Sequence, residues 1–80
     1  MHMDFPESFR LMNELCYREE GFEDVKAVVM DADESYEDNP VVGDMTSKGY
    51  RIIDENYFGE GFERLGKVVV FVKGKRDTRH

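Results

Sequence analysis

The run Lys-Val-Val-Val-Phe-Val-Lys at residues 67–73 limits the possible folds of this chain more than any other feature. Its five central residues are β-branched or aromatic, and Gly66 and Gly74 flank the run. A half-buried strand would alternate apolar with polar residues, so this pattern predicts a strand that is buried on both faces. Burial of five such side chains contributes about 7–15 kcal/mol before the entropy cost of ordering the chain is subtracted. We therefore expect residues 67–73 to be the central strand of a sheet.

Two helices are predicted from apolar spacing and from helix-end signals. Residues 5–20 follow Asp4, a capping residue, and precede Gly21, a typical helix stop. One side of this helix carries an apolar stripe that we expect to face the core, with its cysteine as a small buried residue: Phe5, Phe9, Met12, Leu15 and Cys16. Residues 40–48 form the second helix, because Asn39-Pro40 supplies a cap and a first-turn proline.

Two further strands are expected at residues 24–31 and 50–58, with a long glycine-rich hairpin loop at 59–66. A right-handed crossover makes the strands at 24–31 and 50–58 parallel to each other. The hairpin makes residues 67–73 antiparallel to their neighbours, which gives the spatial order 1-3-2 with the first strand at an edge. The prediction is one small α+β domain over residues 1–80, with a three-stranded mixed or antiparallel sheet packed by two helices.

The second helix must cover one face of the sheet, and the first helix can either join it or cover the opposite face. We favour the arrangement in which both helices share a face. The other face would then expose an apolar surface, which on a small domain is typical of a partner or dimer interface. The residues predicted for this sheet surface are Val69, Phe71, Ile53 and Tyr57, together with Val28 or Met30. A sandwich arrangement would bury the same surface.

Charge is distributed unevenly along the chain. The total is 11 basic and 18 acidic residues, a net charge of −7, but residues 1–63 carry −12 and residues 64–80 carry +5. An acidic body argues against ordinary duplex DNA binding, which needs a basic face. It favours basic partners, or mimicry of a nucleic acid.

The densest acidic stretch is the loop after the first strand, which we interpret as a candidate interaction patch: Asp31, Asp33, Glu34, Glu37 and Asp38. Its Asp-x-Asp-x-Ser opening is similar to a calcium loop, but Tyr36 and Val42 stand where such a loop needs glycine and glutamate. A solvated loop that favours the start of the next helix through its dipole explains most of this charge.

Two other segments have a solvated interpretation and a functional one. The hairpin loop is either a flexible tip or a recognition loop that presents Phe62. The basic end of the chain is either a frayed, solvated tail at 74–80 or a site for phosphates, with Tyr50 and Tyr57 stacking on bases. The basic residues of that alternative nucleic-acid site are Lys73, Lys75, Arg76 and Arg79.

The sequence therefore predicts a non-enzymatic, acidic protein-binding module that acts through the sheet surface, the acidic patch or both. One version is a phage or mobile-element inhibitor that occupies a groove on a nucleic-acid-binding protein. The alternative is a single-stranded nucleic-acid-binding module that uses the last two strands and the basic tail. We expect a protein partner or a second copy, and no catalytic residues, cofactor or metal ligands.

The compartment is predicted from what the chain lacks. One cysteine cannot form an internal disulfide, no apolar run approaches the ~20 residues of a membrane span, and no signal-peptide pattern is present. We therefore expect a cytoplasmic protein without a membrane partner. Met1-His2-Met3 is typical of a vector-derived leader, with Met3 as the natural start.

Overall fold

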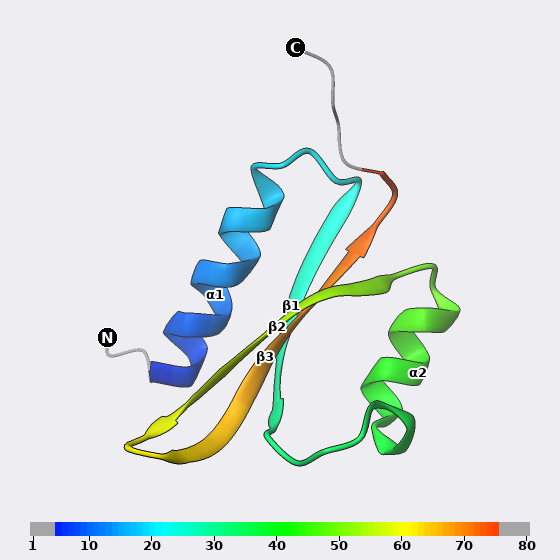
Figure 1. Cartoon of the computed structure of the whole chain (residues 1–80). Coiled ribbons are helices and arrows are strands. Elements are labelled where there is room, and N and C mark those ends of the chain that lie inside the picture. The colour runs from blue at the N-terminus through cyan, green and yellow to red at the C-terminus, as the bar shows by residue number, and fades with distance from the viewer. Residues whose placement is uncertain (1–4, 76–80) are drawn as a thin grey trace.

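The computed structural model describes residues 5–75, which form two α-helices, one 3-10 helix and three strands (Figure 1). In chain order these are α1 (Phe5–Arg18), β1 (Asp24–Asp31), η1 (Tyr36–Asp38), α2 (Pro40–Ser47), β2 (Arg51–Glu60) and β3 (Glu63–Lys73). The predicted α+β class and the predicted element order are confirmed. Arg76, Arg79 and the end of the predicted tail lie outside the described residues.

The sheet has the order β1-β3-β2, and β3 is antiparallel to both neighbours. Val68 through Val72 of β3 are all fully buried, as the uninterrupted apolar run predicts. β1 lies at an edge, and its register places Val25 opposite Val72 and Val29 opposite Val68. The predicted central strand and spatial order are therefore confirmed.

The two helices lie on opposite faces of the sheet, so the prediction that they share a face is wrong (Figure 1). Met45 of α2 packs in a cluster with Val69 and Phe71. The other face holds a cluster of Val25, Val70 and Val72, against which Tyr17 of α1 and two neighbouring residues, Phe22 and Ile53, pack. Alternate residues of β3 thus supply two separate cores, one under each helix.

The hairpin differs from the long loop predicted at residues 59–66, because β2 and β3 continue to Glu60 and Glu63 and leave a short turn. Gly61 takes the left-handed conformation that the turn requires, with φ of 59°. Gly66 is needed for a different reason: a Cβ there would lie 2.5 Å from Cζ of Phe58, whose ring crosses the strand at this point. Gly59 and Gly66, which the sequence pattern predicts in a loop, therefore lie in paired strands, whereas Gly61 stays in the turn.

Candidate interaction surface

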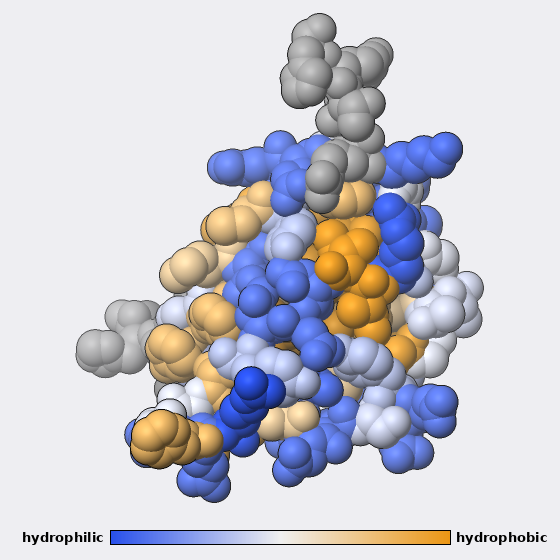
Figure 2. Space-filling model, viewed as in Figure 1, coloured by the Kyte–Doolittle hydropathy of each residue, from blue (hydrophilic) through white to orange (hydrophobic). Residues whose placement is uncertain are grey.

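α1 turns its apolar stripe away from the sheet. Phe5, Met12 and Leu15 are 64%, 60% and 52% exposed, and Cys16 is exposed as well. None of the residues of α1 is fully buried. Figure 2 shows the resulting line of apolar side chains along α1 at the left of the molecule. The predictions that this stripe faces the core and that Cys16 is buried are wrong.

The side of α1 that faces β2 is polar. Nδ2 of Asn56 donates a hydrogen bond to Oδ1 of Asn13 at 2.7 Å, and the hydroxyl of Tyr17 donates to Oδ2 of Asp54 at 2.5 Å. The same amide of Asn56 also reaches Oδ2 of Asp54 at 3.1 Å. These side chains sit over the sheet, where aliphatic residues would ordinarily be expected, so α1 is held on this flank by hydrogen bonds.

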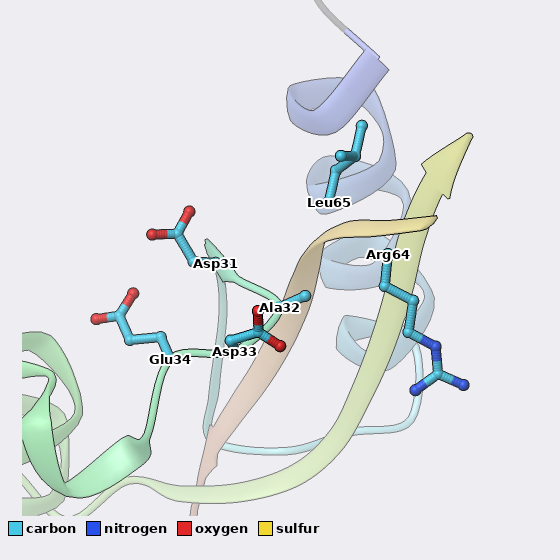
Figure 3. A pocket seen from close by; sticks show the side chains of 6 residues that line it. All are labelled: Asp31, Ala32, Asp33, Glu34, Arg64 and Leu65. Atoms are coloured by element: carbon cyan, nitrogen blue, oxygen red, sulfur yellow. The ribbon is translucent and has the colours of Figure 1, made fainter. Parts of the chain in front are cut away.

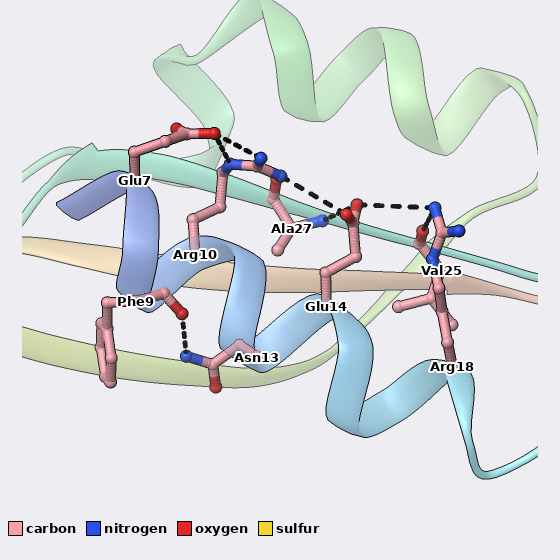
Figure 4. A network of polar contacts seen from close by, with 8 residues as sticks. All are labelled: Glu7, Phe9, Arg10, Asn13, Glu14, Arg18, Val25 and Ala27. Atoms are coloured by element: carbon pink, nitrogen blue, oxygen red, sulfur yellow. Dashed lines mark hydrogen bonds and ion pairs between the residues drawn. The ribbon is translucent and has the colours of Figure 1, made fainter. Parts of the chain in front are cut away.

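The other flank of α1 covers the free edge of β1 (Figure 4). Alternate residues of an antiparallel edge strand direct their N–H and C=O groups away from the neighbouring strand. Nη1 of Arg10 donates to the carbonyl of Ala27 at 3.3 Å, the N–H of Ala27 donates to Oε1 of Glu14 at 3.2 Å, and Nη2 of Arg18 donates to the carbonyl of Val25 at 3.4 Å. α1 therefore occupies the edge at which another strand could have paired.

Ion pairs link the side chains of α1 that contact the edge of β1. Nη1 of Arg10 lies 3.6 Å from Glu14, and Nη2 of Arg18 lies 3.9 Å from the same carboxylate. Nε of Arg10 donates to Glu7 at 2.9 Å, and this hydrogen bond lowers the pKa of Glu7 below its usual value and raises that of Arg10. The sequence pattern indicates only that Arg10, Glu14 and Arg18 lie away from the apolar stripe, because it contains no signal that they bind backbone groups of β1.

An aromatic group extends the exposed apolar surface from α1 onto β2. The rings of Phe5 and Phe9 stack with their centroids 5.7 Å apart, and Phe58 meets each of them edge-on at 6.1 Å. Phe5 is the most exposed of the three, whereas Phe9 and Phe58 are half-buried. The docking face, as we name it, consists of the exposed stripe and this aromatic group: Phe5, Phe9, Met12, Leu15, Cys16 and Phe58.

The apolar sheet surface predicted from the sequence is not exposed. Val69 and Phe71 are fully buried beneath α2. Ile53 belongs to the cluster on the opposite face, because the register shift between Ile52 and Asp54 turns it over. Tyr57 stays half-buried at the sheet margin, under the guanidinium of Arg64 at 4.4 Å. The four residues therefore do not form one surface.

A buried lysine lies in the half of β3 nearest the hairpin. Lys67 is only 5% exposed, and its Nζ donates to the carbonyl of Glu34 at 3.1 Å. The same Nζ lies 4.6 Å from the ring centre of Tyr36 and 5.8 Å from that of Tyr57. Both tyrosine hydroxyls donate to Glu55, which raises the pKa of Tyr57 above its usual value. Lys67 thus links the acidic loop to the sheet through its hydrogen bond to Glu34. The sequence pattern did not predict this role.

The acidic patch lies beside a shallow pocket of about 460 Å³ (Figure 3). Asp31, Asp33 and Glu34 line it with Arg64, but the side chains of Asp31 and Glu34 point away from that guanidinium. Glu37 and Asp38 are exposed in η1 and are not among its lining residues. Over residues 5–75 no group of three or more acidic, cysteine or histidine side chains is placed to hold a metal ion.

Phe62 projects fully into solvent at the hairpin tip, as the recognition-loop interpretation requires. The basic end of β3 is less accessible, because Lys73 is half-buried with its Nζ 5.8 Å from the ring centre of Tyr50. Tyr50 is itself only 9% exposed and donates its hydroxyl hydrogen bond to Asp24. Its ring is therefore unavailable to stack on a base. Lys75 is exposed.

Comparison with protein-family models, curated proteins and solved structures finds no match to this chain. Within residues 5–75 neither helix has the length and apolar character needed to cross a bilayer.

Proposed function

We propose that this chain is a non-enzymatic protein-binding module whose contact surface is the docking face of α1. The observation that carries the proposal is the outward orientation of Phe5, Met12 and Leu15, each more than half exposed. Small domains seldom leave a contiguous apolar surface uncovered unless a partner covers it. The inward side of α1 is occupied by polar contacts to both β1 and β2, so the helix cannot bury its stripe by rotating without losing them.

The energetic gain from covering this face is substantial for so small a domain. Burying one such side chain completely contributes roughly 1.5–3 kcal/mol, so the exposed parts of three contribute about 3–5 kcal/mol in total. Ordering of side chains and loss of rigid-body freedom offset part of this gain. The docking face alone therefore supports a moderate affinity.

The acidic patch supplies a second contact region in this proposal. Asp31, Asp33, Glu37 and Asp38 are exposed carboxylates that attract a basic partner surface over the range of the screening length. An inhibitor from a phage or mobile element that blocks a nucleic-acid-binding groove would use this charge in the same way. The free, exposed Cys16 suits the reducing cytoplasm, where we place the module.

The single-stranded nucleic-acid hypothesis receives less support from the described residues. The two tyrosines that this hypothesis assigns to base stacking are not accessible to a base. Tyr50 is buried, and the guanidinium of Arg64 lies over the ring of Tyr57. Of the described basic residues of this hypothesis, Lys73 is half-buried against the ring of Tyr50, whereas Lys75 is exposed. A protein partner is therefore the function that the geometry supports best.

A photo-crosslinking side chain placed at Leu15 tests the proposal directly. The expected result is a covalent adduct with another polypeptide when the protein is irradiated in its host cell. Val41 of α2 is the matched control position, because it is a comparably exposed apolar residue (42%) on the opposite side of the sheet. Adduct formation at Leu15 that does not exceed that at Val41 would contradict the proposal.

A further inference from the structure

We infer that the partner covering the docking face is a second copy of this chain, with the two α1 helices packed antiparallel across a two-fold axis. The inference rests on the proposed function and names the occupant of the same surface. The acidic patch is not part of the docking face: Asp31 is the last residue of β1, and Asp33 lies in the loop that follows. Three features of α1 support a second copy as the partner: the spacing of its exposed residues, the charges beside them and the size of the surface.

The exposed stripe has the spacing of a two-helix seam. Phe5 and Met12 are seven residues apart, and Leu15 follows Met12 by three residues; the matching position after Phe5 is Ser8, a small polar residue at the end of the stripe. A repeat of this kind keeps one narrow line of side chains facing a partner helix. A helix that packs on a sheet needs a broader apolar side, which α1 instead fills with polar residues.

The charges beside the seam favour the antiparallel direction. Glu7 and Arg18 are 11 residues apart, about three helical turns, so they lie on the same flank of α1 at its two ends. Their side chains remain 48% and 53% exposed. Around a two-fold axis near Met12, Glu7 of each copy faces Arg18 of the other, and the helix dipoles oppose. A parallel pair would place Glu7 against Glu7 and Arg18 against Arg18.

The size of the seam sets the expected strength of the pair. α1 has 14 residues and is therefore about 21 Å long. A single helix face of this length buries less than the ~800 Å² per partner of a standard interface, out of a total surface of 5840 Å². We therefore expect a reversible dimer that forms in the micromolar concentration range rather than a permanent one.

Sedimentation velocity of the purified chain over increasing concentration tests for the dimer. The expected result is a shift from monomer to dimer mass, with Leu15→Glu raising the dissociation constant about tenfold or more. Val41→Glu adds the same charge at an exposed apolar position outside the seam and should leave the dissociation constant unchanged. Circular dichroism checks that both variants remain folded. A wild-type chain that stays monomeric throughout overturns the inference.

Charge exchange tests the antiparallel direction. Glu7→Lys and Arg18→Glu each place like charges together across an antiparallel pair, so each should weaken the dimer severalfold. The double variant restores opposite charges across the interface, although it restores neither the bond between Glu7 and Arg10 nor the contacts of Arg18 with Glu14 and the Val25 carbonyl. Recovery of dimerisation in the double variant supports the inference, and additive weakening contradicts the antiparallel pairing.

Disulfide trapping gives an independent measure of the same geometry. Met12 lies near the proposed axis, so Met12→Cys in a Cys16→Ser background should form an intermolecular disulfide under mild oxidation. Cys16 of the wild type faces Ser8 of the other copy, about 12 Å from the second Cys16, which is too far for a disulfide. In a parallel pair each residue faces its own counterpart, so rapid trapping through the wild-type Cys16 would indicate a parallel pair, and an absence of trapping through Met12→Cys would remove the proposed axis; either result would overturn the inference.

The two proposals fail in distinguishable ways. A chain that is monomeric at all concentrations, yet crosslinks through Leu15 to a different protein, removes the second copy as occupant and leaves the proposed function standing. A chain that is monomeric and gives no adduct at Leu15 removes both.

Discussion

The two helices cover opposite faces of the same sheet by opposite means. α2 buries Met45 against Val69 and Phe71, in the ordinary manner of an amphipathic helix on a sheet. α1 is longer, has a more regular apolar stripe and buries no residue fully. The difference follows from their neighbours. α2 meets the apolar sheet surface through Met45, whereas α1 contacts the Val25, Val70 and Val72 cluster through Tyr17 and otherwise lies across the free edge of β1 and the polar half of β2. An apolar stripe therefore indicates that burial of one side of a helix is favourable. Whether that side packs on the sheet or on a partner depends on the strands beside the helix.

The largest expected effect is a difference in how much the two faces of the sheet contribute to the free energy of unfolding. Phe71→Ala should lower the free energy of unfolding by about 3–5 kcal/mol, because it opens a cavity under α2 at a fully buried position. Phe5→Ala on α1 should cost less than about 1 kcal/mol in the monomer, since that ring is 64% exposed. Urea unfolding at a concentration that keeps the chain monomeric measures both. Equal losses would show that the two faces are packed alike.

The next effect concerns the polar attachment of α1. Glu14→Ala removes the acceptor of the Ala27 N–H and the partner of Arg10 and Arg18, so it should destabilise the fold by about 1–3 kcal/mol. Glu19→Ala, an exposed position just beyond α1, is the control and should change stability by no more than about 0.5 kcal/mol. Hydrogen exchange at Ala27 should become faster in Glu14→Ala. Unchanged protection there would mean that α1 does not seal the edge of β1.

A smaller effect is expected at the start of α2. Asn39 accepts a hydrogen bond from the N–H of Val41 at 2.8 Å, the usual geometry of a helix cap. Asn39→Ala should therefore lower the free energy of unfolding by about 1 kcal/mol more than Asn39→Ser, which retains a capping acceptor, because both variants lose the bond that the Asn39 amide donates to Glu34. Thermal unfolding of the two variants makes the comparison. A serine variant as unstable as the alanine variant would refute the capping role.

The smallest effect is a dependence on pH on the α2 side of the sheet. Tyr50 donates to Asp24, and this hydrogen bond lowers the pKa of Asp24 below its usual value of 3.8. The unfolded chain therefore binds this proton more readily than the folded chain, so the stabilisation is present above pH ~4 and is lost as the pH falls through the folded pKa. Asp24→Asn should flatten this part of the stability profile, and Tyr50→Phe should do the same. A profile unchanged in both variants would contradict the assignment.

Much of the fold follows from local pattern. The uninterrupted run in β3 predicted a central strand, and the helix–strand order together with the hairpin predicted the order β1-β3-β2. The length of the hairpin did not follow, because Gly59 and Gly66 resemble loop residues until their partners across the sheet are known. The face of Ile53 did not follow either, since a register shift leaves no mark in an alternating pattern.

The candidate site was harder to predict, and the reason is physical. Phe5, Met12 and Leu15 were recognised as one apolar stripe, but their direction depends on hydrogen bonds between α1 and strands far along the chain. Arg10 and Glu14 form hydrogen bonds with backbone groups of β1. Because every residue carries such groups, the sequence pattern gives no sign of these contacts. The placement of Lys67 beneath Tyr36 depends in the same way on contacts that are distant in sequence.

The reactivity of Cys16 toward a thiol reagent in the native protein tests the outward orientation of α1 most directly. Cys16 lies at the margin of the exposed stripe and is the single cysteine of the chain, so its signal needs no assignment. We predict that it reacts in dilute native protein at a rate close to that of the denatured chain, and more slowly as the concentration rises and the docking face is covered. A thiol that reacts only after unfolding would mean that the apolar stripe faces the sheet, and it would contradict the docking face and the dimer together.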